Sequence, residues 1–289
     1  MQTELLAGDS AGLFIGLITI LGLAVGSFLN VVIYRLPLMM QNRWKAECCE
    51  LLEQPQSPPV TFNLLKPDSH CPHCQTPIKP WHNIPLLSWA ILGGKCAKCR
   101  QPISIRYPSI ELVSGILSGI IALTFGPTLL TAGLLLLTWA LISLTMIDID
   151  HQLLPDNITL PLMWLGLLVN AQSFGLTDLH SGVIGAAAGY LVLWGVYWLF
   201  KIVTGKEGMG YGDFKLLAAL GAWMGWQQLP LIIILSSFVG AAIGIAGILI
   251  QGRDKNIPIP FGPYLAIAGW IALIWGDTIT GSYLQFAKL

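Results

Sequence analysis

Long apolar runs alternate with short polar stretches along this chain of 289 residues. The first run, residues 12–33, carries no charged side chain and has the length of about 20 residues that a helix needs to cross the hydrocarbon of a bilayer. No Ala-x-Ala cleavage site follows it, so we interpret this run as an anchor and not as a removable signal peptide. Further runs occupy residues 112–147, 158–174, 182–203, 216–250 and 261–276.

Two of these runs are too long for one crossing and contain a break. Gly126-Pro127 interrupts residues 112–147, and Gln227-Gln228-Leu229-Pro230 interrupts residues 216–250. Because proline cannot continue a helix, each of the two runs is expected to form two spans. The pattern therefore predicts an all-α polytopic membrane protein with about eight transmembrane helices.

Composition supports a chain that lies in a lipid bilayer. Apolar residues make up 54% of the chain, charged residues 10%, and the mean hydropathy is +0.69. In soluble proteins about a quarter of the residues are charged. The formal net charge is zero, so nothing in the sequence indicates a nucleic-acid partner.

The distribution of basic residues predicts which side each loop occupies. The segment from Tyr34 to Tyr107 holds nine of the fifteen Lys and Arg residues, and Arg35 and Arg106 flank the adjoining spans. By the positive-inside rule this segment is cytoplasmic, and both termini lie on the other side. Parity of the crossings then places three later loops on the cytoplasmic side as well: those with Asp148, with Asp213, and with Arg253 and Lys255.

All six cysteines lie in this segment, where reducing conditions make disulfides improbable. Two Cys-x-x-Cys pairs are separated by 21 residues, a spacing typical of a zinc ribbon with four thiolate ligands. The expected ligands are Cys71, Cys74, Cys96 and Cys99. A structural zinc ion would let a small segment with little apolar core hold a fold. We interpret Cys48 and Cys49 as incidental, and give His70, His73 and His82 outer-sphere or surface roles.

Three carboxylates, those of Asp148, Asp150 and Asp156, follow the second half of the 112–147 run. Asp148 is the first charge after the apolar residues, and Asp150 lies about 200° further around a helix, so at most one of them faces the bundle interior. Asp148 is the deeper of the two, whereas Asp150 with His151 is expected in headgroup water. Asp156 precedes the next run and is interpreted as its N-cap.

A second acid stands in a similar place, at the end of Gly210-Tyr211-Gly212-Asp213. Asp213 could merely cap the following helix. The two glycines, however, allow unusual backbone angles and close approach of another chain segment. Acids at membrane depth are costly and indicate function. Asp148 and Asp213 together predict a pair that shares one proton, which is the chemistry of an aspartyl protease.

Two other charged residues have modest interpretations. Glu111 at the start of the second span is expected to pair with Arg106. Lys215 could shift the pKa of Asp213, but snorkelling of its ammonium group to the lipid headgroups is the commoner role. Gly93-Gly94 is interpreted as a tight turn into the second cysteine pair.

These motifs together resemble a known family, the bacterial type IV prepilin peptidases of pilus and type II secretion systems. The resemblance covers nearly the whole chain. It rests on the Asp148 and Asp213 segments, on the cysteine pairs, and on three further motifs: Gly26-Ser27-Phe28-Leu29-Asn30, Arg106-Tyr107-Pro108 and Pro258-Ile259-Pro260-Phe261-Gly262-Pro263.

The resemblance implies a membrane enzyme with two activities. Such enzymes cut the basic leader from prepilins and pseudopilins after a Gly at the cytoplasmic face of the inner membrane. They then methylate the new N-terminal residue with S-adenosylmethionine. The family's catalytic aspartates correspond to Asp148 and Asp213. The methyltransferase activity is implied by the resemblance alone, because no Gly-rich cofactor loop is visible.

The expected organisation has three parts: a first transmembrane helix in residues 1–33, a cytoplasmic zinc-ribbon-like domain with a possible methyltransferase part in residues 34–107, and a peptidase bundle in residues 108–289. Three alternatives stay open. A transporter or channel also carries acids in its spans, but usually near the midplane and with repeated halves. The chain could also be a peptidase without methyltransferase activity, or a zinc-ribbon scaffold, which leaves the acid pair unexplained.

Overall fold

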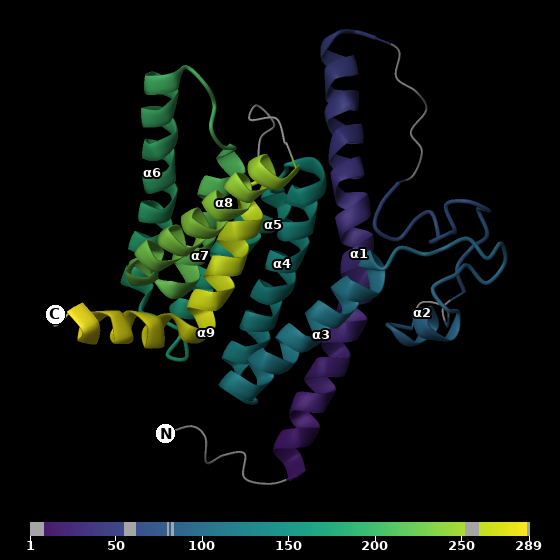
Figure 1. Ribbon diagram of the computed structural model, residues 1–289, viewed down its shortest axis with the longest axis horizontal. Helices are drawn as coiled ribbons and strands as arrows, with labels where there is room; N and C mark the ends of the chain where they lie inside the picture. Colours follow the sequence, from purple (N-terminus) through teal and green to yellow (C-terminus); the bar gives the residue numbers. More distant parts are fainter. Residues whose placement is uncertain (1–8, 55–61, 80, 82–83, 252–259, 288–289) are drawn as a thin grey trace. The chain divides into compact units, whose positions relative to one another are not determined.

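The structure, a computed structural model, describes residues 9–54, 62–79, 81, 84–251 and 260–287. His82, Arg253, Lys255, and Pro258-Ile259 of the proline-rich motif lie outside the described residues. Helices account for all the regular elements in the described ranges (Figure 1). They are α1 (Asp9–Leu51), α2 (Leu87–Ile91), α3 (Arg106–Phe125), α4 (Leu129–His151), α5 (Asp156–Asn170), α6 (Leu179–Thr204), α7 (Tyr211–Met224), η3 (Trp226–Gln228), α8 (Leu229–Gln251) and α9 (Gly262–Ala287).

The long helices match the eight expected spans one for one, which confirms the predicted fold class. Six of them, α1, α3, α4, α6, α8 and α9, are long and apolar enough to cross a membrane. The other two are shorter: α5 has 15 residues and α7 has 14. At a rise of 1.5 Å per residue they extend about 22 Å and 21 Å, less than the ~30 Å of hydrocarbon. These two helices are therefore incomplete crossings.

The described chain divides into two compact units, Met1–Pro127 and Thr128–Leu289. The division falls at the Gly126-Pro127 break, where α3 ends and α4 has not yet begun. The first unit contains α1 to α3 and both cysteine pairs. The second contains α4 to α9 and both of the predicted catalytic acids.

In the first unit, small residues let α1 and α3 approach closely. The hydroxyl of Ser114 donates a hydrogen bond to the carbonyl of Gly22 at 2.7 Å. A Cβ at Gly26 would lie 2.7 Å from the Cα of Glu111, and one at Gly115 would lie 2.6 Å from Leu23. Within a bilayer, packing of this kind is what holds two helices together, since apolar side chains gain little by leaving lipid.

Helix α1 does not end where its apolar run ends. It continues through Pro37 to Leu51, so the whole helix is 43 residues long. Arg35, which follows the first apolar run, is buried with 6% of its surface exposed. Its guanidinium donates to the carbonyls of Asn63 at 3.0 Å and Pro67 at 2.6 Å. This arginine thus ties the segment after α1 back onto the helix.

The second unit is built around α7. From Asp213 to Met224 every residue except Lys215 is buried. Gly185 of α6 and Gly221 of α7 meet backbone to backbone, so a Cβ on either would collide with the carbonyl of the other. On the α5 side, the indole of Trp223 covers Gly166 and donates to the carbonyl of Leu162 at 2.9 Å. Neighbouring helices therefore surround the short helix.

The last carbonyls of α7 also find partners. The amide of Asn170, at the end of α5, donates to the carbonyls of Ala222 at 2.8 Å and Trp223 at 2.9 Å. Helix ends leave backbone carbonyls without intrahelical partners, and no water is available deep in a bilayer to satisfy them. Asn170 supplies these hydrogen bonds, which allows α7 to end inside the bundle.

Candidate active site

Asp148 lies in the last turn of α4 and is buried, with 6% of its surface exposed. Its Oδ2 accepts a hydrogen bond of 3.0 Å from the backbone N–H of Gly262, the first residue of α9. Asp150, two residues later, is exposed. The helical geometry argued from the sequence is therefore correct: one acid faces the interior and the other faces outward.

Asp213 lies in the first turn of α7 and is equally buried. Its Oδ2 accepts a hydrogen bond of 3.2 Å from the backbone N–H of Gly210, so the acid does help to cap the helix. Its Oδ1 is buried and has no hydrogen-bond partner among the residues that the structure describes. Such atoms are rare in folded proteins, because losing water without a replacement partner is costly. This oxygen is available to a proton, a water molecule or a substrate.

One side chain connects the surroundings of the two acids. Leu154, in the loop between α4 and α5, packs against Gly212 and Gly262. A Cβ at Gly212 would lie 2.7 Å from the Cβ of Leu154, and one at Gly262 would lie 2.7 Å from Oδ2 of Asp148. The end of α4 and the starts of α7 and α9 therefore meet at one end of the second unit (Figure 1). Asp148 and Asp213 therefore both belong to this cluster of helix ends.

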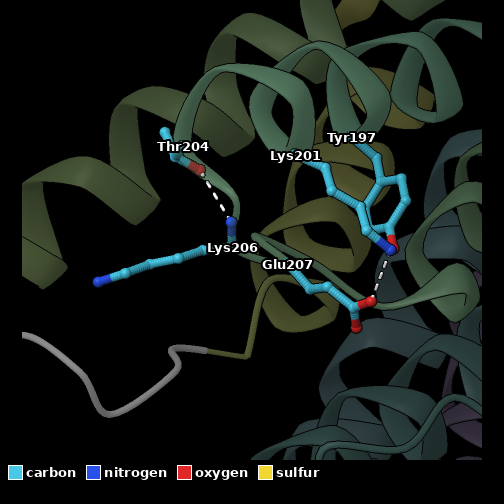
Figure 2. A network of polar contacts seen from close by, with 5 residues as sticks. All are labelled: Tyr197, Lys201, Thr204, Lys206 and Glu207. Carbon is cyan, nitrogen blue, oxygen red and sulfur yellow. Dashed lines mark hydrogen bonds and ion pairs between the residues drawn. The ribbon is translucent and has the colours of Figure 1, made fainter.

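A polar network holds the loop that leads into the Gly-x-Gly-Asp motif. Figure 2 shows Lys201 of α6 between Tyr197 and Glu207. Its Nζ donates to the carboxylate of Glu207 at 2.8 Å and to the hydroxyl of Tyr197 at 3.2 Å. The hydrogen bond from Lys201 lowers the pKa of Glu207 below its ordinary value. The charged form of Glu207 thus anchors the loop to α6.

Aromatic packing extends this support to the motif itself. The ring of Tyr197, buried with 2% exposed, lies 5.4 Å from the ring of Tyr211 and 5.7 Å from that of Phe214. Tyr211 and Phe214 come directly before Gly212 and directly after Asp213. The aromatic contacts therefore fix the chain on both sides of the acid.

One interpretation of a charged residue near the acids is wrong. Asp156 does not cap α5, because Pro155 occupies the N-cap position and Asp156 lies inside the first turn. The Nζ of Lys215 lies 2.7 Å from both carboxylate oxygens of Asp156, an ion pair that was not expected from the sequence. The starts of α5 and α7 bring these opposite charges together, and 28% and 52% of their side chains stay exposed.

Glu111 is buried in the first unit, and its Oε2 accepts a hydrogen bond of 2.9 Å from the backbone N–H of Leu86. Leu86 is the residue before α2 and has a φ of +58°. The carboxylate therefore holds a turn that a residue with a side chain rarely adopts. No local sequence pattern indicates this contact, because Leu86 and Glu111 are 25 positions apart along the chain.

The four predicted ligand cysteines form one cluster. The Sγ atoms of Cys71, Cys74, Cys96 and Cys99 all lie within 4.8 Å of one another. The two Cys-x-x-Cys pairs repeat the same local fold. In each, the N–H of the first cysteine donates to the carbonyl five residues later, Thr76 at 3.0 Å or Gln101 at 2.8 Å. The residue after the second cysteine has positive φ in both pairs.

The dimensions of the cluster suit a tetrahedral ion. Four thiolates about 2.3 Å from a zinc ion would be about 3.8 Å apart. The distance from Cys71 Sγ to Cys99 Sγ is 3.8 Å, and that from Cys74 Sγ to Cys96 Sγ is 4.0 Å. Within the cluster, hydrogen bonding with Thr76 lowers the pKa of Cys74, whereas burial and the neighbouring thiols raise the pKa of Cys99. His70 and His73 are exposed and are not members of the cluster found in the described residues.

Residues 20–125 match the bacterial peptidase A24 N-terminal domain, and residues 135–245 match the type IV leader peptidase family. A protein of Stutzerimonas stutzeri named prepilin leader peptidase/N-methyltransferase is 60% identical over 272 residues, which cover 93% of both chains. This chain belongs to the type IV leader peptidase family.

Other relatives of this leader peptidase carry the same name. One from Pseudomonas aeruginosa is 58% identical over 270 residues, covering 93% of this chain and 92% of its own length. One from Neisseria gonorrhoeae is 50% identical over 265 residues and 91% of both chains. No solved structure matches this leader peptidase. The family resemblance drawn from the motifs is confirmed.

Proposed function

We propose that this protein is an aspartic endopeptidase that removes the basic leader of prepilins and pseudopilins after a Gly, and then methylates the new N-terminal residue with S-adenosylmethionine. One observation carries the peptidase proposal. Two buried acids, Asp148 and Asp213, stand in a common cluster at one end of the helix bundle, and one oxygen of Asp213 has no partner in the described part of the chain. The relatives' names support both activities.

The proposed mechanism uses the two acids and one water molecule. Two neighbouring carboxylates do not both ionise readily, so one of them retains a proton. The ionised acid takes a proton from water as the water oxygen attacks the scissile carbonyl. The protonated acid gives its proton to the carbonyl oxygen, and the resulting tetrahedral intermediate breaks down when the departing nitrogen receives a proton. The N–H of Gly262 holds the Asp148 carboxylate in place throughout.

The proposed location is the bacterial inner membrane, with the acids at its cytoplasmic face. The concentration of Lys and Arg in residues 34–107 supports this orientation. A prepilin in this membrane would keep its basic leader in the cytosol and its apolar stem in lipid. Residues 1–33 then form the first transmembrane helix, residues 34–107 the cytoplasmic domain, and residues 108–289 the peptidase bundle.

The four-cysteine cluster is proposed to bind one structural zinc ion. Cys71, Cys74, Cys96 and Cys99 would fill all four positions of a tetrahedral site, which leaves no position for substrate. The ion would supply folding energy to the stretch between α1 and α3, whose described residues contain one short helix, α2.

The methyltransferase site is proposed to lie in residues 34–107. A cavity of about 390 Å³ in the second unit does not suit S-adenosylmethionine, because its lining is apolar throughout and includes Ile184, Val192 and Trp226. A charged cofactor requires polar partners. The cytoplasmic segment offers such groups, since it contains most of the basic residues of the chain.

A transporter or channel is not favoured. Acids that carry ions usually lie near the midplane of a membrane. Asp148 instead lies in the last turn of its helix and Asp213 in the first turn of its own. Membership of a leader peptidase family also argues for hydrolysis.

The experiment that tests this function uses the purified full-length protein in detergent micelles. A model peptide with a basic leader, a Gly and an apolar stem is incubated with and without S-adenosylmethionine. Mass spectrometry should find the leader removed in both samples and one methyl group added only with the cofactor. A peptide that stays intact in both samples would contradict the peptidase proposal. Cleavage without any methyl gain would leave a peptidase that lacks the second activity.

A further inference from the structure

The loop between α4 and α5 inserts one apolar side chain between the start of α7, which carries Asp213, and the start of α9, whose Gly262 donates a hydrogen bond to Asp148. Leu154 is half-buried in this loop. A Cβ at Gly262 would lie 3.1 Å from both terminal methyl carbons of Leu154, and one at Gly212 would lie 2.7 Å from its Cβ. Leu154 therefore occupies the space that side chains at positions 212 and 262 would need.

Both of these glycines stand directly beside an acid. Gly212 precedes Asp213 in the chain, and Gly262 donates its N–H to Asp148. A peptide that reaches the unpartnered Oδ1 of Asp213 must come within hydrogen-bond distance of it, about 3 Å. Because Leu154 packs against both of these glycines, we expect substrate atoms next to the reacting bond to compete for space with its side chain.

We propose that Leu154 limits the size of the substrate residue bound next to the two acids, so that Leu154 is a specificity-determining residue. The inference rests on the proposed peptidase function. A bulky side chain at that substrate position would have to displace Leu154, whose backbone is held between the end of α4 and the buried Pro155. A substrate residue without a Cβ avoids this displacement.

Two other roles for Leu154 make different predictions. If its packing against the glycines only stabilises the fold, truncation lowers cleavage of every substrate in the same proportion. If it is a lid that must open, truncation raises cleavage of every substrate in the same proportion. Only a size limit changes the ratio between a substrate with a small residue and one with a larger residue.

The test compares two peptides that differ only in the residue before the scissile bond, Gly or Ala. The full-length wild-type protein, Leu154→Ala and the control Leu153→Ala are assayed in micelles for kcat/KM on each peptide. Leu153 is the neighbouring residue of the same loop with similar exposure. Removing the leucine side chain opens room for more than one methyl group, so the Ala-to-Gly ratio of kcat/KM should rise about 10-fold or more in Leu154→Ala. It should stay unchanged in Leu153→Ala.

An unchanged ratio in Leu154→Ala, whether both rates fall, rise or stay the same, would overturn the inference. If that variant fails to fold, Leu154→Val provides the second measurement, since it removes a single methylene and should raise the ratio by a smaller factor. A wild-type protein that leaves the Gly peptide uncut would instead refute the proposed function itself. The two failures are therefore distinguishable.

Discussion

At the scale of single residues, Asp213 combines two roles that are usually treated as alternatives. One oxygen accepts the N–H of Gly210 and so stabilises the start of α7, while the other is buried without a partner in the described structure. An acid that only capped the helix would have no reason to keep its second oxygen away from water, since an unsatisfied buried acceptor costs about 1–3 kcal/mol. The orphaned oxygen is what distinguishes this acid from a cap.

Replacing either acid by its amide should abolish cleavage. Asp148→Asn and Asp213→Asn keep the shape of the side chain but cannot share a proton, and loss of a general acid or base lowers rates by about 10²–10⁴-fold. Leader removal from the model peptide, followed by mass spectrometry, measures the effect. Asp150→Asn and Asp156→Asn are the controls and should retain activity. Cleavage near the wild-type rate by either dyad variant, in a preparation with normal elution on gel filtration, would remove the dyad hypothesis.

At the scale of elements, the central feature is a short buried helix enclosed by glycine contacts. The apolar runs of the sequence predicted this helix and its seven longer companions, because lipid requires apolar side chains wherever a helix crosses it. They predicted neither the shortness of α5 and α7 nor the extension of α1 to Leu51. Hydropathy indicates which residues lie in lipid. It does not indicate where a helix ends, and α1 continues well beyond its apolar residues.

The site was predictable only in part, because its acids stand out in the local sequence and its other residues do not. Asp148 stood out because it was the first charge after an apolar run, and Asp213 because of the glycines before it. Leu154 and Gly262 did not stand out. Their roles come from tertiary contacts, and the partners Asp148 and Gly262 are 114 positions apart along the chain. No local pattern reports a contact over such a separation.

The glycine contact between α6 and α7 can be tested with a matched pair on one helix. Gly185→Ala should lower the thermal unfolding midpoint and the cleavage rate, because the new methyl group collides with the Gly221 carbonyl and pushes α7 away. Gly195→Ala, on the same helix, has nothing within 4 Å of the added Cβ. It should be neutral or slightly stabilising, since alanine favours a helix over glycine by about 1 kcal/mol. Equal midpoints for the two variants would contradict the packing described for α7.

At the scale of the whole molecule, the chain consists of two compact units, one with the cysteine cluster and one with the acids. The cluster should bind one zinc ion per chain, with Zn–S distances of about 2.3 Å measured by X-ray absorption. Metal analysis of a reduced preparation, purified without chelators, provides the count. Absence of zinc from that preparation, or a disulfide between the cysteine pairs, would argue decisively against the structural site.

The two proposed activities should be separable by mutation. Hydrolysis requires Asp148, Asp213 and water, whereas methyl transfer is proposed to depend on residues 34–107. Replacing Cys71 and Cys74 together by Ser should therefore reduce methylation more than cleavage of the model peptide. Leader loss and methyl gain are scored separately by mass spectrometry. Full methylation by this double variant, or a strictly proportional fall of both activities across several variants in the segment, would refute the division.

The proposed orientation predicts an outcome for chemical labelling in intact cells. A thiol reagent that cannot cross membranes should label none of the six native cysteines, all of which lie in residues 34–107, the segment proposed to be cytoplasmic. Asp178→Cys, placed in the loop between α5 and α6, should be labelled from outside. Strong external labelling of Cys48 or Cys49 would invert the orientation.

The shortness of α7 has a consequence for how the protein is made. A stretch of 14 residues, about 21 Å long, with Asp213 and Lys215 in its first turns, is a poor candidate for independent entry into a bilayer. Helices α5 and α6 precede it in the chain and supply much of the surface that covers it. During biosynthesis α7 should therefore enter the membrane against α5 and α6, which are already in place. Because α5 and α6 precede α7 along the chain, Asp213 enters the bilayer only after two of the helices that cover it have been synthesised.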